Sequence, residues 1–331
     1  MEKALLIRFS SIGDIVLTTP VIRCLKKQRP DIELHFLTKK SFANLLQSNP
    51  YIDRLHTLDN ELKPIIEALK AENFHYVIDL HNNQRTWLIK KALKTRTFSF
   101  NKINLEKWLM VNLKWNRLPK SHIVDRYLET VADLGVKNDG EGLDYFIPAK
   151  EEVNIEAHFP EVKTGTYIAA VIGAKHATKQ MPKHKWMNLC ELIEKPVIVL
   201  GGPEDAEIGE EIASKSGNHV FNACGKFTLH QSASIVRQAE KVISHDTGLM
   251  HIAAAFNQNI ASIWGNTIPE LGMYPYLSES SNQAYKIFEM KDLNCRPCSK
   301  IGYPKCPKKH FACMELIDET LIADWANETV Y

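Results

Sequence analysis

Residues 241–265 read KVISHDTGLMHIAAAFNQNIASIWG, and this stretch decides the fold. A short apolar strand at 241–244 runs into His245-Asp246-Thr247-Gly248. A helix of small and apolar residues follows at 249–256, and a second apolar strand at 260–264. Strand, tight turn, helix and strand in this order form one βαβ unit. Its polar residues cluster at the carboxyl end of the first strand, where open α/β sheets bind their ligands.

The start of the helix at 249–256 is a predicted phosphate site. Its first N–H groups have no partner within the helix, and they carry the positive end of the helix dipole. Both features favour a bound phosphate. Asp246 and Thr247 are either helix caps or ligand contacts. His251 shares this helix end with Asp246-Thr247-Gly248, which favours a place beside phosphate or sugar over a purely structural role.

Strands and helices alternate along the whole chain, which predicts parallel, doubly wound sheets. In the first half, the expected strands are 3–9, 33–37, 54–58 and 76–80, and the expected helices are 14–28, 42–47, 61–72 and 123–134. In the second half, the expected strands are 167–172, 197–200, 219–221, 241–244 and 260–264, and the expected helices are 183–194, 204–215, 229–238 and 249–256. The charged segment 138–164, with its Pro and Gly residues, is interpreted as the linker.

We therefore predict an α/β fold with two Rossmann-like domains that face each other across a cleft. The predicted domains are 1–155 and 156–314, and a C-terminal helix at 315–331 is expected to fold back on the first domain. Neither half carries the G-x-G-x-x-G fingerprint, which disfavours a nucleotide-dependent oxidoreductase. The ligand is expected in the cleft between the halves.

Composition excludes several classes of protein. The chain has 331 residues, 44% of them hydrophobic, and a net charge of +2, so it has no overall bias towards nucleic acid. It lacks a run of 18 apolar residues, and Arg8 interrupts the N-terminal apolar run too early for a signal peptide. The seven cysteines are odd in number, as suits a reducing cytoplasm. We expect a cytoplasmic protein.

Basic residues gather between Arg85 and Lys120. This stretch holds ten Lys and Arg residues, opposed only by Glu106, with Trp87, Trp108 and Trp115 between them. Such a pattern favours contact with an anionic surface, either membrane headgroups or an acidic, phosphorylated glycolipid. The alternative is a solvated helical face with buried Trp side chains. No nucleic-acid-binding motif accompanies the charge, so nucleic acid is not an expected partner.

The first strand ends in Ser10-Ser11-Ile12-Gly13-Asp14, a candidate catalytic turn. Gly13 permits a tight turn and a close approach of the backbone. Asp14 begins the following helix at the carboxyl edge of the first strand. Two interpretations remain open for it: a helix cap, or a carboxylate placed to take a proton from a hydroxyl group.

Two further loops follow strands of the second half. Residues 173–182, GAKHATKQMP, bring cations to a strand end. A helix dipole contributes only about 0.3–1 kcal/mol, too little for a departing diphosphate, so a Lys is the expected supplement, and we select Lys179. Gly201-Gly202-Pro203-Glu204-Asp205 follows another strand. Glu204 is either a ribose contact or an ordinary first-turn residue.

Together these motifs resemble glycosyltransferase family 9, the ADP-heptose:lipopolysaccharide heptosyltransferases of Gram-negative bacteria. The resemblance spans most of the chain, and the order and spacing of its motifs make it specific. Its motifs are Ser10–Asp14 with Thr19-Pro20, Asp125-Arg126-Tyr127, the 173–182 loop, and Asp246-Thr247-Gly248-Leu249-Met250-His251. One departure is visible: Thr178 and Lys179 are adjacent, and Met181 rather than Trp precedes Pro182.

The resemblance implies a glycosyltransferase-B fold whose first domain binds the acceptor and whose second binds ADP-heptose. By the same resemblance Asp14 is the general base, and Ser10, Ser11 and Gly13 lie on the acceptor side. The donor contacts that it implies are Thr178, Lys179, Glu204, Asp246, Thr247, Gly248, Leu249 and His251. The expected reaction is inverting transfer of a heptose to an inner-core sugar hydroxyl, with ADP leaving, at the cytoplasmic face of the inner membrane.

Two alternatives remain beside this hypothesis. The first is a glycosyltransferase of the same fold that uses another nucleotide sugar. The second is a non-catalytic nucleotide-sugar-binding protein, which the presence of Asp14 and Lys179 disfavours.

A cysteine-rich segment closes the chain. Cys295 and Cys298 form a CxxC pair, and Cys306 and Cys313 follow at irregular spacing. Such a set either binds a structural zinc ion or remains as free thiols, and the irregular spacing favours free thiols. The expected chemistry needs no metal or other cofactor.

Overall fold

The computed structural model describes residues 2–329 and divides into two compact units. Among the described residues, the first unit comprises 2–103, 121–146 and 278–280, and the second comprises 104–120, 147–277 and 281–329. The chain therefore crosses between units at 146–147, inside the segment interpreted as a linker. The basic stretch is also split, because residues 104–120 belong to the second unit.

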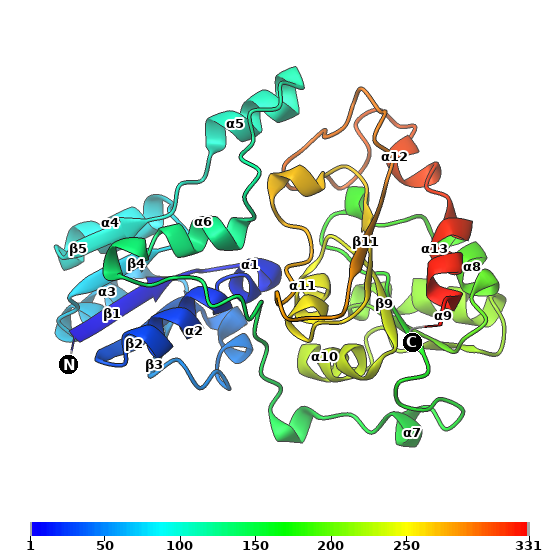
Figure 1. Cartoon of the computed structure of the whole chain (residues 1–331), viewed down its shortest axis with the longest axis horizontal. Coiled ribbons are helices and arrows are strands. Elements are labelled where there is room, and N and C mark those ends of the chain that lie inside the picture. The colour runs from blue at the N-terminus through cyan, green and yellow to red at the C-terminus, as the bar shows by residue number, and fades with distance from the viewer. Residues whose placement is uncertain (1, 330–331) are drawn as a thin grey trace. The chain divides into compact units, whose positions relative to one another are not determined.

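The first unit is a parallel sheet with helices along its strands (Figure 1). Its strands are β1 (Glu2–Ile7), β2 (Ile32–Lys39), β3 (Arg54–Leu58), β4 (Tyr76–Asp79) and β5 (Arg96–Ser99). Its α-helices are α1 (Ile12–Val16), α2 (Thr19–Gln28), α3 (Leu62–Ala71), α4 (Gln84–Leu93) and α6 (Ile123–Glu129), with 3-10 turns at Lys40–Leu45 and Ala132–Leu134. The helix expected at 14–28 is thus two helices, and Pro20 lies in the first turn of α2, where its missing N–H costs nothing.

The strand order of this sheet, β3-β2-β1-β4-β5, places β1 at the topological switch point. The β1 strand pairs with β2 on one side and β4 on the other, in parallel. Residues 4–7 of β1 are fully buried and apolar, as expected for a central parallel strand covered on both faces. Ligands of such sheets bind outside the carboxyl ends of the strands at the switch point, and β1 leads there directly into α1.

The second unit is also a parallel α/β sheet. Its strands are β6 (Ile168–Val171), β7 (Val197–Leu200), β8 (Val220–Asn222), β9 (Lys241–His245), β10 (Ile260–Trp264) and β11 (Tyr285–Glu289). Its α-helices are α5 (Asn104–Trp108), α7 (Ile155–His158), α8 (Lys183–Leu192), α9 (Ala206–Lys215), α10 (Leu229–Gln238), α11 (Gly248–Ala255), α12 (Ala312–Glu315) and α13 (Glu319–Asn327). A π-helical turn at Leu109–Leu113 extends α5, and 3-10 turns occupy Ala149–Glu151, Ala177–Lys179, Pro203–Asp205 and Pro269–Leu271.

The strand order of the second sheet is β11-β10-β9-β6-β7-β8, so its switch point lies between β9 and β6. Two segments follow the carboxyl ends of these strands. One is the loop 173–182 after β6, and the other is the turn into α11 after β9. Both are segments that the sequence singled out, and the sheet brings them to the same edge.

The C-terminal helix α13 packs within the second unit. Ile322, Ala323 and Ala326 are buried in that unit's core, and Glu319 pairs with Lys185 of α8 at 2.6 Å. The expectation that this helix folds back on the first domain is therefore wrong. Its apolar face finds a partner in α8, its neighbour in the same unit.

Candidate active site

Asp14 lies in the first turn of α1, just beyond the end of β1. Its Oδ1 atom accepts from Arg8 Nη2 at 2.6 Å, and the side chain is 22% exposed. Its Oδ2 atom accepts from the Ser11 backbone N–H at 3.1 Å and from the Ser11 hydroxyl at 2.8 Å. The bond to the Ser11 N–H is a capping interaction, so the structural role that the sequence left open is present.

Asp14 also keeps the electrostatic character of an ionised carboxylate. Burial raises the pKa of Asp14, but the Arg8 charge and the hydrogen bonds from Ser11 outweigh burial and leave that pKa below its usual value. The carboxylate is therefore charged at neutral pH and able to accept a proton. Capping and proton acceptance are compatible, because a carboxylate carries about four lone-pair sites.

Arg8 is a supporting residue that sequence reasoning did not select. Its side chain is 8% exposed and uses its whole guanidinium fork. It donates to Ser10 O at 2.9 Å, to Leu80 O at 2.6 Å and to the Tyr127 hydroxyl at 2.9 Å, besides pairing with Asp14. The sequence feature that could have identified it is a single Arg at the end of an otherwise apolar strand. Arg8 fixes the carboxyl edge of β1 and β4 and orients Asp14.

The other first-unit candidates, Ser10 and Gly13, contribute through their backbones. Ser10 supplies the carbonyl that holds Arg8, and Gly13 O accepts from Leu17 N at 2.9 Å within α1. Ser11 is the one acceptor-side candidate whose side chain contacts Asp14. These residues shape the turn, and contact with an acceptor remains a prediction.

The second unit contains a polar cluster at its switch point. The Lys179 ammonium forms an ion pair with Asp246 and also donates to the Asp246 backbone carbonyl at 3.2 Å. Thr267, which follows β10, donates to Asp246 Oδ2 at 3.1 Å. Lys179 comes from the loop after β6 and Asp246 from the end of β9. Two residues 67 positions apart in sequence thus meet as the strand order requires.

The start of α11 lies beside this cluster. Thr247 is its N-cap with extended backbone, and its side chain makes no capping hydrogen bond. Thr247, Gly248 and Leu249 are each partly exposed, so the first N–H groups of the helix are reachable. His251 is 1% exposed and lies in the first turn. This helix start has the phosphate-binding features expected from sequence.

His245, directly before Asp246, is fully buried. Its Nε2 atom accepts from the Met181 backbone N–H at 2.9 Å, and burial lowers the pKa of His245 to about 3. The ring is therefore neutral and links β9 to the loop after β6. His245 belongs to the His-Asp-Thr-Gly motif, and in the structure its side chain joins β9 to the loop after β6.

Thr178 has a different environment from the one implied by the resemblance. Its side chain is 2% exposed, accepts from Tyr303 N at 2.8 Å and donates to Tyr303 O at 3.2 Å. Its backbone N–H also donates to Tyr303 O, at 3.2 Å. Thr178 thus joins the Lys179 loop to the cysteine-rich segment. Sequence reasoning could not find this partner, which lies 125 residues away.

Glu204 is exposed in the 3-10 turn after β7, while its neighbour Asp205 is 5% exposed. Asp205 Oδ2 accepts from Gly202 N at 2.8 Å. A Cβ atom at Gly173 would lie 2.3 Å from that same oxygen, and one at Gly201 would lie 2.8 Å from it. These glycines therefore make room for the Asp205 carboxylate.

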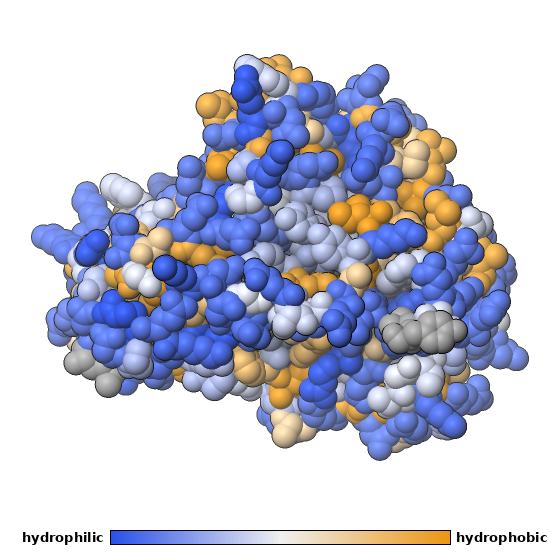
Figure 2. All heavy atoms as spheres, viewed as in Figure 1, coloured by the Kyte–Doolittle hydropathy of each residue, from blue (hydrophilic) through white to orange (hydrophobic). Residues whose placement is uncertain are grey.

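The Trp residues of the basic stretch are exposed. Trp87, Trp108 and Trp115 are 53%, 54% and 51% exposed, which contradicts the alternative with buried Trp side chains. Leu105 and Leu113 are exposed as well. In Figure 2, apolar side chains stand among strongly polar ones where Figure 1 draws α5. We call the segment 104–120, with its exposed Trp and Leu side chains, the basic hairpin.

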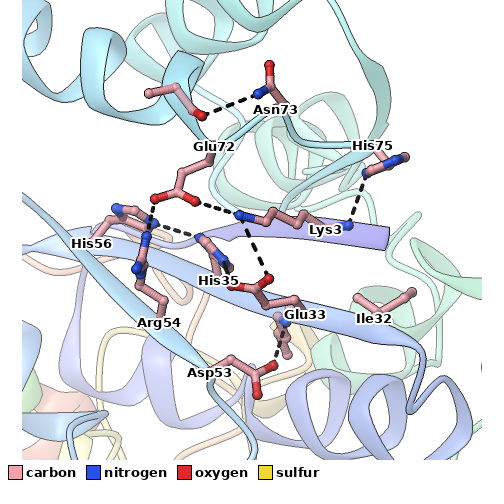
Figure 3. A network of polar contacts seen from close by, with 12 residues as sticks. Lys3, Ile32, Glu33, His35, Asp53, Arg54, His56, Glu72, Asn73 and His75 are labelled. Atoms are coloured by element: carbon pink, nitrogen blue, oxygen red, sulfur yellow. Dashed lines mark hydrogen bonds and ion pairs between the residues drawn. The ribbon is translucent and has the colours of Figure 1, made fainter. Parts of the chain in front are cut away.

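A second polar network lies in the first unit, away from the carboxyl edge (Figure 3). The side chains of His35, His56 and Glu72 hold their ligating atoms within 4.8 Å of one another. Lys3 pairs with Glu72 at 2.8 Å, and Arg54 pairs with its other oxygen. Since two cations already neutralise this carboxylate, a metal ion there would be repelled. We interpret the network as structural.

Comparison with known proteins decides the family. A model of glycosyltransferase family 9 (heptosyltransferase) matches residues 63–305, more than half of the chain. The chain belongs to glycosyltransferase family 9. It is 26% identical over 292 residues to lipopolysaccharide heptosyltransferase 1 of Campylobacter coli, covering 80% of this chain and 84% of that relative. The sequence-based recognition of the family, and of a glycosyltransferase, is confirmed.

Solved structures confirm the fold of this family 9 member. A family 9 glycosyltransferase from Veillonella parvula matches with a TM-score of 0.72 and 20% identity, over 86% of each chain. Escherichia coli heptosyltransferase WaaC with ADP-2-deoxy-2-fluoro heptose matches with a TM-score of 0.65 and 20% identity, over 86% of this chain and 92% of that one. The expected glycosyltransferase-B architecture of two Rossmann-like domains is thus confirmed.

Proposed function

We propose that this family 9 glycosyltransferase transfers a heptose from ADP-heptose to a sugar hydroxyl of the lipopolysaccharide inner core, with inversion at the anomeric carbon. Family membership supports the reaction class. The name of the Campylobacter coli relative supports the lipopolysaccharide acceptor, and the ligand named for the WaaC structure supports the donor.

In this reaction Asp14 accepts the proton of the acceptor hydroxyl. The acceptor oxygen forms a bond to the anomeric carbon as the bond from that carbon to the β-phosphate oxygen breaks. The electron pair of the broken bond leaves with ADP. No metal or other cofactor is required for any of these steps.

The observation that carries the proposal is the meeting of Lys179 with the start of α11 at one switch point. A departing diphosphate gains negative charge, and an ammonium group together with unpaired backbone N–H groups stabilises such charge. We assign the diphosphate to Lys179 and to the backbone of Thr247, Gly248 and Leu249. Lys179 exchanges its partner Asp246 for phosphate oxygens when the donor binds.

The remaining donor residues take supporting parts. Glu204 is exposed beside the strand ends and accepts hydrogen bonds from the ribose hydroxyls. His251 supports the sugar end from the first turn of α11. Thr178 positions Lys179 through its hydrogen bonds with Tyr303 rather than by touching the donor.

The acceptor is acidic and lipid-linked, so the protein must work at a membrane surface. None of the helices in the described part of the chain is long and apolar enough to cross a bilayer. The basic hairpin offers Trp108 and Trp115 beside the exposed cations Lys114, Arg117 and Lys120. Aromatic and basic side chains together suit an anionic membrane interface, and we place the protein peripherally at the cytoplasmic face of the inner membrane.

The decisive experiment is a turnover assay with ADP-heptose and truncated lipopolysaccharide. Formation of ADP and of a heptosylated acceptor supports the proposal. A thermal-shift series with ADP, UDP and GDP names the donor base, because the tightest ligand raises the melting temperature most. Greatest stabilisation by UDP or GDP would instead favour a glycosyltransferase that uses another nucleotide sugar. ADP binding without turnover would favour a non-catalytic protein.

Binding to a membrane surface is tested by co-sedimentation with vesicles that contain anionic phospholipid. A Trp108→Ser, Trp115→Ser double variant should lose most of its binding, since each Trp contributes interfacial contact. Leu321→Ser on α13 is the matched control, because Leu321 is 52% exposed and lies outside the basic hairpin. Equal binding by wild type and the double variant would exclude the hairpin as the contact surface.

A further inference from the structure

The cysteine-rich segment folds into a small pocket of its own. All four of its thiols line this pocket, together with His310 and Lys308: they are those of Cys295, Cys298, Cys306 and Cys313. The 19-residue span from Cys295 to Cys313 thus folds around this pocket, although the spacing of its cysteines is irregular. We call this the cysteine pocket.

Two side chains around the cysteine pocket suit an occupant that carries negative charge on sulfur. Asn266 lines it and is 1% exposed, yet among the described residues neither its side-chain nitrogen nor its side-chain oxygen has a hydrogen-bond partner. Leaving a buried polar group unpaired is unfavourable. His310 Nδ1 accepts from Ala312 N at 3.0 Å, so its Nε2 carries the proton and points at Cys295 Sγ, 3.9 Å away. Both supply N–H donors of the kind that orient metal-bound thiolates.

Cations also lie close to the pocket. Lys114 of the basic hairpin donates to Pro297 O at 2.6 Å and to Cys295 O at 3.4 Å, within the CxxC turn. Arg296, 8% exposed, and Lys308 line the pocket itself. Four thiolates around a divalent ion carry a net charge of −2, which Lys114 and Lys308 offset, while Arg296 is paired with Glu289.

From this arrangement we propose that the four thiols of the cysteine pocket bind one thiophilic metal ion, either Zn²⁺ or iron. Thiolate-rich, four-coordinate sites select these metals. Metal–sulfur bonds of about 2.3 Å place tetrahedral sulfurs about 3.8 Å apart. Among the residues that the structure describes, only His35, His56 and Glu72 gather as tightly as 4.8 Å. Metal binding therefore draws the four sulfurs together and tightens the segment around them.

The metal site stabilises the donor loop through the backbone of the same segment. Tyr303, between the second and third cysteines, holds Thr178 by three hydrogen bonds. Arg296, inside the CxxC turn, donates to Gly265 O at 2.6 Å and to Thr267 O at 2.8 Å. Thr267 in turn binds Asp246, the partner of Lys179. Both ends of the Lys179–Asp246 pair are thus tied to the cysteine pocket.

Metal content of the purified full-length chain is the primary test. Elemental mass spectrometry should find about one zinc or iron per chain, and the element found names the metal. Cys298→Ser and Cys306→Ser should each lose most of it. Cys24→Ala, whose thiol is buried in α2 of the first unit, is the control and should keep the full content.

The link to the donor loop rests on the proposed function and is tested separately by ADP titration before and after chelation. Removing the metal should weaken ADP binding about fivefold or more, in the range of ordinary coupling between sites, and readdition should restore it. If the purified chain contains the metal but its affinity for ADP is unchanged by chelation, the metal site stands and the link to the donor loop is overturned. Failure of wild type to bind ADP at all would overturn the proposed function, and the metal content would still stand.

Three results would overturn the metal site itself. One is a chain free of zinc and iron after expression in medium supplemented with both. Another is a disulfide between two of the four cysteines in the intact mass of protein purified without reductant. The third is full metal content in both serine variants.

Discussion

Replacing Asp14 with Asn tests the assignment of the general base most sharply. Asn has nearly the shape of Asp but accepts no proton at neutral pH. Loss of a general base typically costs a factor of about 10²–10⁴ in rate. At 1.36 kcal/mol for each factor of ten, this is about 3–5 kcal/mol of transition-state stabilisation. We therefore expect kcat to fall by about 10²–10⁴, while the affinity for ADP stays within about threefold.

The same substitution has a structural cost that follows from the contacts of Asp14. Its Oδ1 faces Arg8 Nη2 and its Oδ2 faces the Ser11 N–H, so both oxygens accept hydrogen bonds. An amide replaces one acceptor by an NH2 donor, and either orientation places a donor against a donor. One hydrogen bond of this partly exposed side chain is lost, which costs about 0.5–1.5 kcal/mol, and we expect the melting temperature to fall by a few degrees.

Asp125→Asn separates the two effects. Asp125 occupies the equivalent position in α6, where its Oδ2 accepts from the N-cap N–H of His122 at 3.0 Å. It should lose comparable stability and retain turnover within about threefold. Steady-state turnover of ADP-heptose and isothermal titration with ADP measure the two quantities. Turnover of Asp14→Asn within twofold of wild type would remove Asp14 as the base. Equal losses of turnover and ADP affinity would refute the division between chemistry and donor binding.

Three further predictions concern other parts of the chain. Lys179→Met should weaken ADP binding about 10–100-fold, since a charge-assisted hydrogen bond contributes about 1.5–3 kcal/mol; an unchanged calorimetric titration would contradict the diphosphate assignment. Arg296 and Glu289 form a buried ion pair at 2.7 Å. Arg296→Gln should lower the free energy of unfolding by about 3–5 kcal/mol, because it leaves the Glu289 carboxylate buried without its guanidinium partner. Arg237→Gln, from an exposed pair with Glu152, should cost less than about 1 kcal/mol in the same urea titration. Burial and the neighbouring His35 lower the pKa of His56 to about 4. Between about pH 6.5 and 4, His56 is therefore protonated in the unfolded chain but neutral in the native state, and protonation favours unfolding. Stability should fall as pH drops from 6.5 to 4, and His56→Gln should flatten that fall in melting temperatures measured against pH; an identical profile would contradict the assignment.

Much of the fold was predictable because central parallel strands are buried on both faces. The strands at Val197–Leu200 and Ile260–Trp264 were predicted at their observed bounds, and both are uninterrupted buried segments. Two edge strands, β5 and β11, escaped prediction, whereas the edge strand β3 was predicted at its observed bounds, Arg54–Leu58. The missed strands, Arg96–Ser99 and Tyr285–Glu289, carry polar residues that face solvent, so their apolar pattern is weak.

The candidate site was predictable to the extent that it follows strand ends. Asp14, Lys179 and Asp246 each lie in a segment that follows a predicted strand, and the switch-point rule brings Lys179 and Asp246 together. The supporting partners were not predictable, because they depend on contacts between distant segments. Arg8 reaches Tyr127 across 119 positions, and Thr178 reaches Tyr303 across 125. No local pattern contains such pairings.

The environment of Asp14 also constrains the order of events in the proposed reaction. Arg8 keeps the carboxylate charged, but the same stabilisation makes Asp14 a weak base, with a pKa below its usual value. A weak base does not remove a proton from a free sugar hydroxyl to any useful extent. The hydroxyl becomes acidic only once its oxygen has begun to bond to an electron-poor anomeric carbon. In the transition state, cleavage of the bond to ADP must therefore be more advanced than proton transfer to Asp14. The more strongly Lys179 and α11 stabilise the diphosphate, the larger this difference becomes. Because both groups act on one transition state, Lys179→Met and Asp14→Asn should be strongly non-additive in kcat. Strictly multiplicative losses would show that the two groups contribute independently, and would contradict the coupling of ADP departure to proton transfer.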